Sequence, residues 1–421
     1  MPWDRRLFLK TSGLALLSFG AGPEFLHRAA HAATATSSGA RKRTLVTIFQ
    51  RGAMDGLAAV APTGGRELAA LRPRLALSAA RAAGDGALLD LGVGFGLHPG
   101  FADLLPFWRD GSLAIVHAVG SPDATRSHFD AQDYMESGTP GRKGTDSGWL
   151  NRVCGELGHD ATPFRAVAMT PALPRSLYGR EPAVAISRLE DFEVRLPGAA
   201  KVAAAAGRGF EALYEQTSQE LLAETGRETF DAVKMLSSTE IARYRPAPGV
   251  RYPAGPLGDA LRQVAQLVKS DLGLEVAFVE SGGWDTHVAQ GAADGTFARR
   301  AGDLGAAIAA FWSDLGARRD DVTLMTMTEF GRTVRENGSG GTDHGHGSCL
   351  FVLGTGVDGG KVHGDFPGLD RDALYEGRDL PVTTDFRAVF AEVAGNHLGI
   401  ANDRAIFPEW NGRRRPLWRR S

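Results

Sequence analysis

Leu274-Glu-Val-Ala-Phe-Val279 has the apolar and β-branched composition of a buried strand. Residues 296–318 follow with apolar positions near helical spacing, and Val322-Thr-Leu-Met-Thr-Met327 is a second apolar segment of strand length. Strands that alternate with helices form a largely parallel sheet, because each helix carries the chain back across one face of the sheet. We therefore predict an α/β sandwich, with a largely parallel central sheet and helices on both faces.

Carboxylates, histidines and glycines flank these strands. Glu280-Ser-Gly-Gly-Trp-Asp285-Thr-His287 comes directly after the first strand, and Thr328-Glu329-Phe-Gly-Arg332 comes after the second. A third cluster, Gly341-Thr-Asp343-His344-Gly-His346-Gly, precedes the apolar segment 349–353. Sites in parallel sheets lie outside the carboxyl ends of the strands. These side chains therefore indicate metal binding or acid–base chemistry at that edge.

The rest of the chain continues the same alternation. Further strands are predicted at residues 44–50, 113–119, 164–169, 183–186 and 349–353. Helices are predicted at residues 66–82, 131–136, 147–157, 200–242, 257–270 and 384–394. Strand 44–50 leads to Asp55, and strand 113–119 leads through a polar loop to Ser127 and His128. If these strands are parallel, the loops that follow them meet at one edge of the sheet.

The third cluster stands in a different position, because Asp343, His344 and His346 precede their strand. They join the other polar residues only if the loop between residues 329 and 348 folds back toward the same edge. The glycine-rich segment 337–341 can make the sharp turn that this requires.

The donor types of these clusters suit a divalent metal ion. Carboxylate oxygens and imidazole nitrogens are ligands of zinc and manganese, and two such ions about 4 Å apart can clamp an in-line displacement at phosphorus. The alternative is that the same groups cap turns and hydrogen-bond one another around a structural loop. The candidate metal ligands are Asp55, Glu280, Asp285, His287, Glu329, Asp343, His344 and His346.

Three further residues are candidates for catalysis. Ser127 could be a nucleophile, or the N-cap of the helix that follows it. His128 could be a metal ligand or a base. Arg332 could bind the anionic group of a substrate, or pair with Glu329. The sequence leaves both interpretations open for each residue.

Composition excludes some classes of partner. The 421 residues include 47 basic and 49 acidic ones, for a formal net charge of −2. This balance gives no electrostatic reason to expect nucleic acid or an anionic membrane as a partner, so we predict neither. No segment after the N-terminus is long and apolar enough to span a membrane. Cys154 and Cys349 are predicted to be buried free thiols, and a disulfide between them is the alternative.

Residues 1–33 have the features of an export signal. Arg5 and Arg6 precede the apolar run 14–21, and Ala30-His-Ala-Ala33 is a small-residue cleavage pattern. Paired arginines before a short apolar run are typical of a twin-arginine signal. The alternative is a buried amphipathic N-terminal helix. We predict export to the periplasm or the medium, a flexible linker over 34–43, and a single domain over 44–421.

Five motifs give the chain a resemblance to a known family. They are Arg51-Gly-Ala-Met-Asp-Gly-Leu, Arg126-Ser-His-Phe-Asp-Ala-Gln, Gly282-Gly-Trp-Asp-Thr-His, Thr328-Glu-Phe-Gly-Arg-Thr and Gly341-Thr-Asp-His-Gly-His-Gly. Through these motifs the chain resembles the DUF1501 family, exported proteins of uncharacterised activity that are grouped with the alkaline phosphatase/sulfatase superfamily. The resemblance implies an alkaline-phosphatase-like α/β sandwich.

The resemblance also implies roles for particular residues. In that superfamily a first-strand Asp, a Ser or Thr nucleophile, an Asp with a following His, and an Asp-His pair hold two metals. The matching residues, in order, are Asp55, Ser127, Asp285 with His287, and Asp343 with His344. The chain departs from the pattern at Glu329, which stands where phosphatases have their Asp-His pair directly after the strand. Its spacing from Asp285 to His287 is also shorter than usual.

Together these features predict an exported, metal-dependent hydrolase of phosphate or sulfate esters. Two divalent ions (zinc, manganese or magnesium) would clamp the ester, and Ser127 or a metal-bound water would attack it. The partners would be a small anionic ester substrate and the twin-arginine export machinery. The alternative is a non-catalytic periplasmic binding or assembly protein on the same fold.

Replacing Arg5 and Arg6 together by Lys tests the export signal. Because this route reads the paired arginines through a receptor, the variant should stay in the cytoplasm and lose its exported fraction. Immunoblots of cell fractions measure this, with Lys10→Arg as a control that leaves the arginine pair intact. Unchanged export of the double variant would contradict the assignment.

Overall fold

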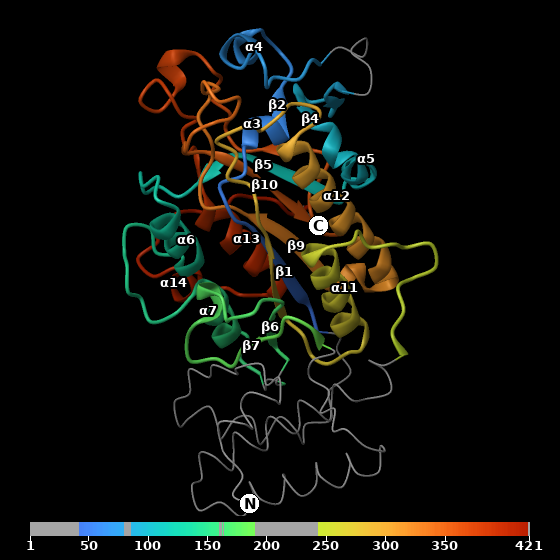
Figure 1. Cartoon of the computed structure of the whole chain (residues 1–421). Helices are drawn as coiled ribbons and strands as arrows, with labels where there is room; N and C mark the ends of the chain where they lie inside the picture. The colour runs from blue at the N-terminus through green and yellow to red at the C-terminus, as the bar shows by residue number, and fades with distance from the viewer. Residues whose placement is uncertain (1–41, 80–85, 160–161, 163, 190–242, 420–421) are drawn as a thin grey trace, which may run out of the picture.

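The computed structural model describes residues 42–79, 86–159, 162, 164–189 and 243–419. The predicted signal segment 1–33, nearly all of the linker 34–43 and the predicted helix 200–242 lie outside the described residues. The division into signal, linker and one domain therefore stays a prediction. The predicted α/β architecture is confirmed, with helices on both faces of a large central sheet (Figure 1).

The central sheet has the strand order β11-β5-β10-β9-β1-β8-β6-β7, and β12 pairs with β5. Its strands are β1 (Thr44–Gln50), β5 (Leu113–Gly120), β6 (Ala166–Ala168), β7 (Val184–Ala185), β8 (Val276–Ser281), β9 (Val322–Met327), β10 (Ser348–Leu353), β11 (Val362–His363) and β12 (Thr384–Asp385). β1 lies between β8 and β9 and is parallel to both. All of its residues are buried, as expected for a central parallel strand.

β10 runs against its neighbours. It is antiparallel to β9 and to β5, whereas β9, β1, β8 and β6 are parallel to one another. Its first residue, Ser348, therefore lies at the edge of the sheet where β5 and β9 end. The loop that carries Asp343, His344 and His346 reaches this edge because the strand after it is reversed. The sequence alone suggested that the loop would have to fold back.

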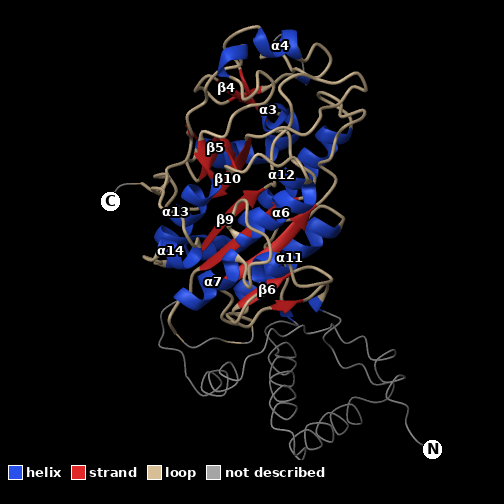
Figure 2. Cartoon of the chain, turned by 90° about the vertical axis from the view of Figure 1, so that its left-hand side faces the viewer, coloured by secondary structure: helices blue, strands red, loops and turns tan. Residues whose placement is uncertain are grey.

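Helices cover the two faces of the sheet. The longer ones are α6 (His128–Ser137), α7 (Trp149–Glu156), α11 (Pro256–Lys269), α12 (Thr296–Leu315) and α13 (Phe386–Leu398), and the shorter ones are α3 (Gly56–Ala59), α4 (Glu67–Leu71), α5 (Leu105–Arg109) and α14 (Asp403–Ile406). Alternate residues of β1 face different helices. Val46 and Ile48 belong to the core with α11 and α12, and Leu45 and Phe49 to the core with α7 and α13. Figure 2 shows α11 and α12 on one side of the sheet and α13 and α14 on the other.

Several short elements, α3, α5, α14, β11 and β12 among them, were not predicted from the sequence, and two further regions differ from the prediction. A small antiparallel sheet of β2 (Val60–Pro62), β4 (Phe95–Leu97) and β3 (Leu89–Asp90) was not predicted, because strands of two or three residues carry no readable period. The predicted helix 66–82 is wrong over residues 72–79, because α4 ends at Leu71, and residues 80–82 lie outside the described residues. Pro73 follows, and a proline disfavours helical conformation in the residue before it, Arg72.

Both cysteines are buried and unpaired, which confirms the prediction of free thiols. Burial raises the pKa of the Cys154 thiol to about 12, so this thiol stays protonated at neutral pH. Within the part of the chain that the structure describes, no helix combines the length and apolar character needed to cross a membrane.

A buried histidine makes the fold sensitive to acid. The Nε2 atom of His117 lies 2.9 Å from the Val60 carbonyl oxygen, and its Nδ1 atom accepts the Ala118 N–H at 2.9 Å. This pattern needs the neutral imidazole, and complete burial lowers the pKa of His117 to about 4. The unfolded chain binds more protons than the folded one between about pH 6.5 and that value. The stability from this group is therefore full above this window and is lost as the pH falls through it.

His117→Gln tests this source of acid sensitivity. Glutamine keeps a donor for the Val60 carbonyl but has no proton to gain, so the variant should lose less stability than the parent protein on acidification. The difference between their unfolding free energies should change by about 3 kcal/mol between pH 7 and pH 4. Urea titrations at several pH values measure it, and parallel pH curves for the two proteins would contradict the assignment.

Candidate metal centre

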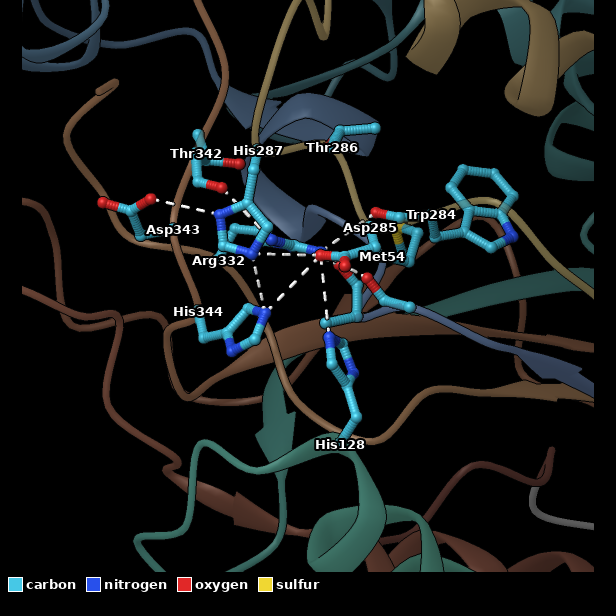
Figure 3. A network of polar contacts seen from close by, with 12 residues as sticks. Met54, His128, Trp284, Asp285, Thr286, His287, Arg332, Thr342, Asp343 and His344 are labelled. Atoms are coloured by element: carbon cyan, nitrogen blue, oxygen red, sulfur yellow. Dashed lines mark hydrogen bonds and ion pairs between the residues drawn. The ribbon is translucent and has the colours of Figure 1, made fainter. Parts of the chain in front are cut away.

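The loops that carry the predicted site residues meet at one edge of the central sheet. β5 leads to α6, whose first residue is His128, and β8 leads to the loop that carries Asp285 and His287. His344 lies shortly before the reversed strand β10. Figure 3 shows these four side chains pointing toward one another. We call His128, Asp285, His287 and His344 the histidine–aspartate cluster.

Three imidazole nitrogens surround one carboxylate oxygen in this cluster. Asp285 Oδ1 is 3.2 Å from His287 Nε2, 3.5 Å from His344 Nε2 and 3.6 Å from His128 Nε2. Donor atoms of His128, Asp285 and His344 all lie within 4.8 Å of one another. Such separations fit donors that share a single divalent ion at about 2 Å from each atom.

The other ring nitrogens of two histidines show which way their lone pairs point. His287 Nδ1 lies 3.1 Å from Asp343 Oδ1, and His344 Nδ1 lies 2.9 Å from the backbone oxygen of Arg126. Both partners are acceptors, so each Nδ1 carries a proton, and in the neutral ring each Nε2 then presents a lone pair. The two Nε2 atoms are only 2.8 Å apart. Two lone pairs repel at this distance unless a metal ion or a proton lies between them.

Glu329 contacts the ring of His128 at Nδ1, the nitrogen that does not face Asp285. Its buried Oε1 accepts the Gly52 N–H at 2.8 Å and the Gln132 amide at 2.9 Å, and lies 2.9 Å from His128 Nδ1. This hydrogen bond raises the pKa of His128, although burial opposes the shift. Burial also raises the pKa of Glu329, but the hydrogen bonds from His128 and Gln132 outweigh it and lower that pKa. The structure thus places Glu329 behind a cluster histidine rather than among the donor atoms.

The Nε2 atom of His128, unlike its Nδ1 atom, lacks a hydrogen-bond partner within the described residues. This nitrogen is also buried. A buried imidazole nitrogen without a partner costs about 1–3 kcal/mol, which an ion bound by the cluster would offset.

Arg332 joins the loops that carry the cluster. Its fully buried guanidinium donates to the carbonyl oxygens of Gly52, Ala53, Trp284 and Thr342. Its Nη2 atom also lies 2.5 Å from Asp285 Oδ1. Burial raises the pKa of Asp285, but the hydrogen bond and charge of Arg332 outweigh it and lower that pKa. All these contacts of Arg332 are internal, whereas the sequence analysis considered a substrate anion or Glu329 as its partner.

Two glycines let the loops approach closely. Gly52 has a φ of 113°, and a Cβ there would lie 2.5 Å from the backbone nitrogen of Asp285. A Cβ at Gly345 would lie 2.4 Å from the carbonyl carbon of Arg332. Contacts this short to backbone atoms cannot be relieved by a side-chain rotation, so a larger residue would push the loops apart.

Asp55 lies apart from the cluster. Its carboxylate forms a buried ion pair with Arg72 at 2.7 and 3.1 Å, accepts the Gln290 amide at 2.8 Å, and caps α3 by accepting the Ala58 N–H at 3.2 Å. These donors occupy both oxygens. The structure therefore gives Asp55 the surroundings of an anchor for the loop after β1, in contrast to the predicted ligand position.

Three other predicted ligands also lie outside the donor set. Asp343 stands behind His287, as described above. Glu280 Oε1 accepts two N–H groups of Arg51, at 2.7 and 3.1 Å. His346 Nδ1 lies 3.8 Å from Asp379 Oδ2, and the His346 ring lies 4.5 Å from the Tyr375 ring.

Ser127 occupies the N-cap position of α6, but its side chain accepts no cap hydrogen bond. The predicted N-cap role therefore does not account for the Ser127 hydroxyl. Gln132 and Asn337 are site residues that the sequence analysis missed. Gln132 lies four residues after His128 on one helix, and this spacing could have placed both beside the same partner. Asn337 Nδ2 donates to Asp343 Oδ1 at 3.1 Å, and this bond is the main cause that lowers the pKa of Asp343.

A cavity of about 820 Å³ lies away from the cluster, against α7. Asn151, Tyr178 and Glu181 are among the residues that line it. None of the predicted site residues borders this cavity. The donor chemistry, and not the size of a hollow, therefore identifies the candidate centre.

The chain has a match among protein families and a distant likeness among solved structures. Residues 114–408, more than half of the chain, match the family described as "Protein of unknown function (DUF1501)". No curated protein matches the chain. Among solved structures, the chain is similar to the crystal structure of the PsFucS1 sulfatase from Pseudoalteromonas sp., with 14% sequence identity and a TM-score of 0.36. That match covers 94% of this chain and 78% of the other, and a likeness of this size carries no argument about activity.

Arg332→Lys tests whether the buried guanidinium holds the centre together. Lysine keeps the charge but cannot reach several carbonyl oxygens in different directions, so buried acceptors would lose their donors. The unfolding free energy should fall by about 3 kcal/mol, and the metal content should fall with it. Urea unfolding and elemental analysis measure these changes. The control is Arg318→Lys, in an exposed pair with Asp271, and equal behaviour of the two variants would contradict the role of Arg332.

Proposed function

Because the chain belongs to the DUF1501 family, whose function is unknown, we propose a function from its own site: a metal-dependent hydrolase of phosphate or sulfate esters. The histidine–aspartate cluster carries this proposal. Three imidazoles direct Nε2 toward the oxygen of one ionised carboxylate, and each Nδ1 is held by an acceptor. The two Nε2 atoms of His287 and His344 are 2.8 Å apart, a separation that either a shared metal ion or a shared proton accounts for, and the nearby Asp285 carboxylate supports the ion.

The donor set favours zinc among the ions predicted from the sequence. Imidazole nitrogen suits zinc, whereas magnesium and manganese prefer shells of oxygen ligands. Within the described residues, His128, Asp285 and His344 form the single group of three or more such donors that could hold an ion, and His287 Nε2 lies beside Asp285 Oδ1 at 3.2 Å. We therefore propose one ion here, where the sequence suggested two.

A divalent ion bound to the cluster would act as a Lewis acid that polarises an ester and lowers the pKa of water. The chain's own residues supply the geometry for this. Glu329 and Asp343 fix the rings of His128 and His287, and such outer carboxylates orient metal ligands in known centres. Ser127, which precedes His128, is the alternative nucleophile.

Export is part of the proposal. The paired Arg5 and Arg6, the apolar run and the cleavage pattern within residues 1–33 support a twin-arginine signal. This route moves folded proteins, so the metal could be loaded before the protein leaves the cytoplasm. The working place of the enzyme would then be the periplasm or the medium.

A non-catalytic role is the second candidate, and the number of donors favours it. If all four donors bind one zinc ion, the tetrahedral shell is closed, which is typical of structural sites. The protein would then be an exported binding or assembly protein. However, Asp285 is also held by Arg332, and three imidazoles without it would leave a position open for substrate, as in catalytic zinc sites.

His344→Ala and Asp285→Asn test the proposed centre. His344→Ala removes a donor atom and Asp285→Asn replaces an ionised carboxylate ligand by a neutral amide, so the full-length protein should fall from one ion per chain to a small fraction, and ester hydrolysis should fall at least 100-fold. Elemental analysis and the release of nitrophenol from its phosphate and sulfate esters measure the two effects. The control is His363→Ala, which removes a half-buried histidine of β11 outside the cluster.

The results of these measurements distinguish a catalytic metal centre from a structural one. A metal-free parent protein would overturn the centre itself. One tightly bound ion without hydrolysis across a broad ester panel would favour the structural role. If the parent protein hydrolyses an ester, Ser127→Ala distinguishes the two possible nucleophiles. Attack by a metal-activated water predicts that the variant keeps nearly full hydrolytic activity. Attack by Ser127 predicts a loss of activity comparable to that of the donor variants.

A further inference from the structure

We propose that Arg126 and Arg378 form an anion subsite beside the histidine–aspartate cluster and hold the acidic group of the substrate. This inference deepens the proposed hydrolase, on which it rests, by assigning the recognition of negative charge to two residues outside the metal-binding cluster.

Both guanidinium groups are placed by one buried carboxylate. Arg126 donates to Asp379 Oδ2 through Nη2 at 2.7 Å and Nε at 3.1 Å, and Arg378 donates to the same oxygen through Nη1 at 3.3 Å. The Asp379 side chain is fully buried, whereas those of Arg126 and Arg378 are 30% and 40% exposed. The carboxylate thus fixes two cations whose outer parts remain open to solvent.

Both arginines are tied to a histidine of the cluster. The backbone oxygen of Arg126 accepts from His344 Nδ1 at 2.9 Å. On the other side, Arg378 Nη2 donates to the backbone oxygen of His344 at 3.0 Å. His344 therefore contacts both segments that carry these guanidinium groups, and the Arg378 guanidinium itself lies against the His344 backbone.

Two carboxylates face the two guanidinium groups, but only one of them is buried. One buried carboxylate faces two guanidinium groups, so Asp379 alone neutralises only one of them. The other acidic partner is Glu376, which lies 2.8 Å from Arg126 Nη2 and is 56% exposed. A pair this open to water is weak, and a doubly charged phosphate or a sulfate can displace it. Arg378 has Asp379 as its one ion-pair partner within the described residues.

The chemistry of the subsite distinguishes it from the cluster. Guanidinium groups bind the oxygens of phosphate and sulfate through paired N–H donors, which fix orientation as well as charge. An ester that carries an ionised phosphate or sulfate group would be recognised here. A neutral carboxylic ester has no anionic group for the two arginines to bind, so it would interact with the metal ion alone. We therefore expect the enzyme to prefer anionic esters because of Arg126 and Arg378.

The test measures anion binding and does not depend on turnover. Calorimetric titration of the metal-loaded, full-length protein with inorganic phosphate and, separately, with sulfate gives the affinity of each anion. Arg126→Ala and Arg378→Gln should each weaken the preferred anion about 10-fold to 100-fold with metal content unchanged. Glutamine at 378 keeps a donor for the His344 carbonyl. Arg126→Lys, which keeps the charge, should restore part of the loss, and Arg318→Ala is the surface control.

Several results would overturn the subsite. These are failure of the parent protein to bind either anion, equal affinity in the arginine variants and the surface control, or loss of metal along with loss of the anion. The last result would show that the arginines only position His344. Weaker anion binding in the arginine variants, in a parent protein that hydrolyses no ester, would support the subsite and count against the hydrolase alone.

Discussion

The buried guanidinium of Arg332 is the contact on which the candidate centre depends. It comes from the segment after β9 and reaches carbonyl oxygens in the loop after β1, the loop after β8 and the segment before β10. Strands of a sheet fix the direction in which their loops leave, but not how those loops pack. One planar cation with several donors removes that freedom, because each loop loses a hydrogen bond if it moves. Gly52 and Gly345 make the convergence sterically possible.

The cluster combines groups that repel without an ion and attract with one. Outer acceptors hold the Nδ1 atoms of its imidazoles, so each ring in its neutral form presents an Nε2 lone pair, and Asp285 adds a negative charge that Arg332 partly balances. Such a site is organised before the ion arrives, so binding has little conformational entropy left to remove. This arrangement also explains why several predicted ligands stand one step away from the donor atoms. Carboxylates such as Glu329 and Asp343 are needed there to orient the rings, and a metal centre without these partners would be poorly defined.

The sequence predicted the strands well because buried parallel strands are short apolar runs, and 44–50, 113–119 and 322–327 are clear examples. The cluster residues were among the predicted ligands, because histidines and aspartates beside strand ends are typical of metal sites in parallel sheets. The sequence could not show the direction of β10, because the composition of an apolar strand does not indicate whether the strand is parallel or antiparallel to its neighbours. Nor could it separate Asp55 from the ligands. The partners that occupy its oxygens are Arg72, 17 residues away, and Gln290, 235 residues away, and no local pattern reports a pairing across such distances.

The central place of β1 has a consequence for how the chain is made. β1 is the first strand to leave the ribosome, yet both of its neighbours are encoded far downstream, and Thr47 bonds to the Ala277 carbonyl 230 residues away. At about 5–20 residues per second, the strand waits tens of seconds for its partners. During that time an apolar segment with unpaired backbone groups is available to chaperones or to other nascent chains. If the proposed export route carries the folded chain, export has to wait until the last strands of the sheet are complete.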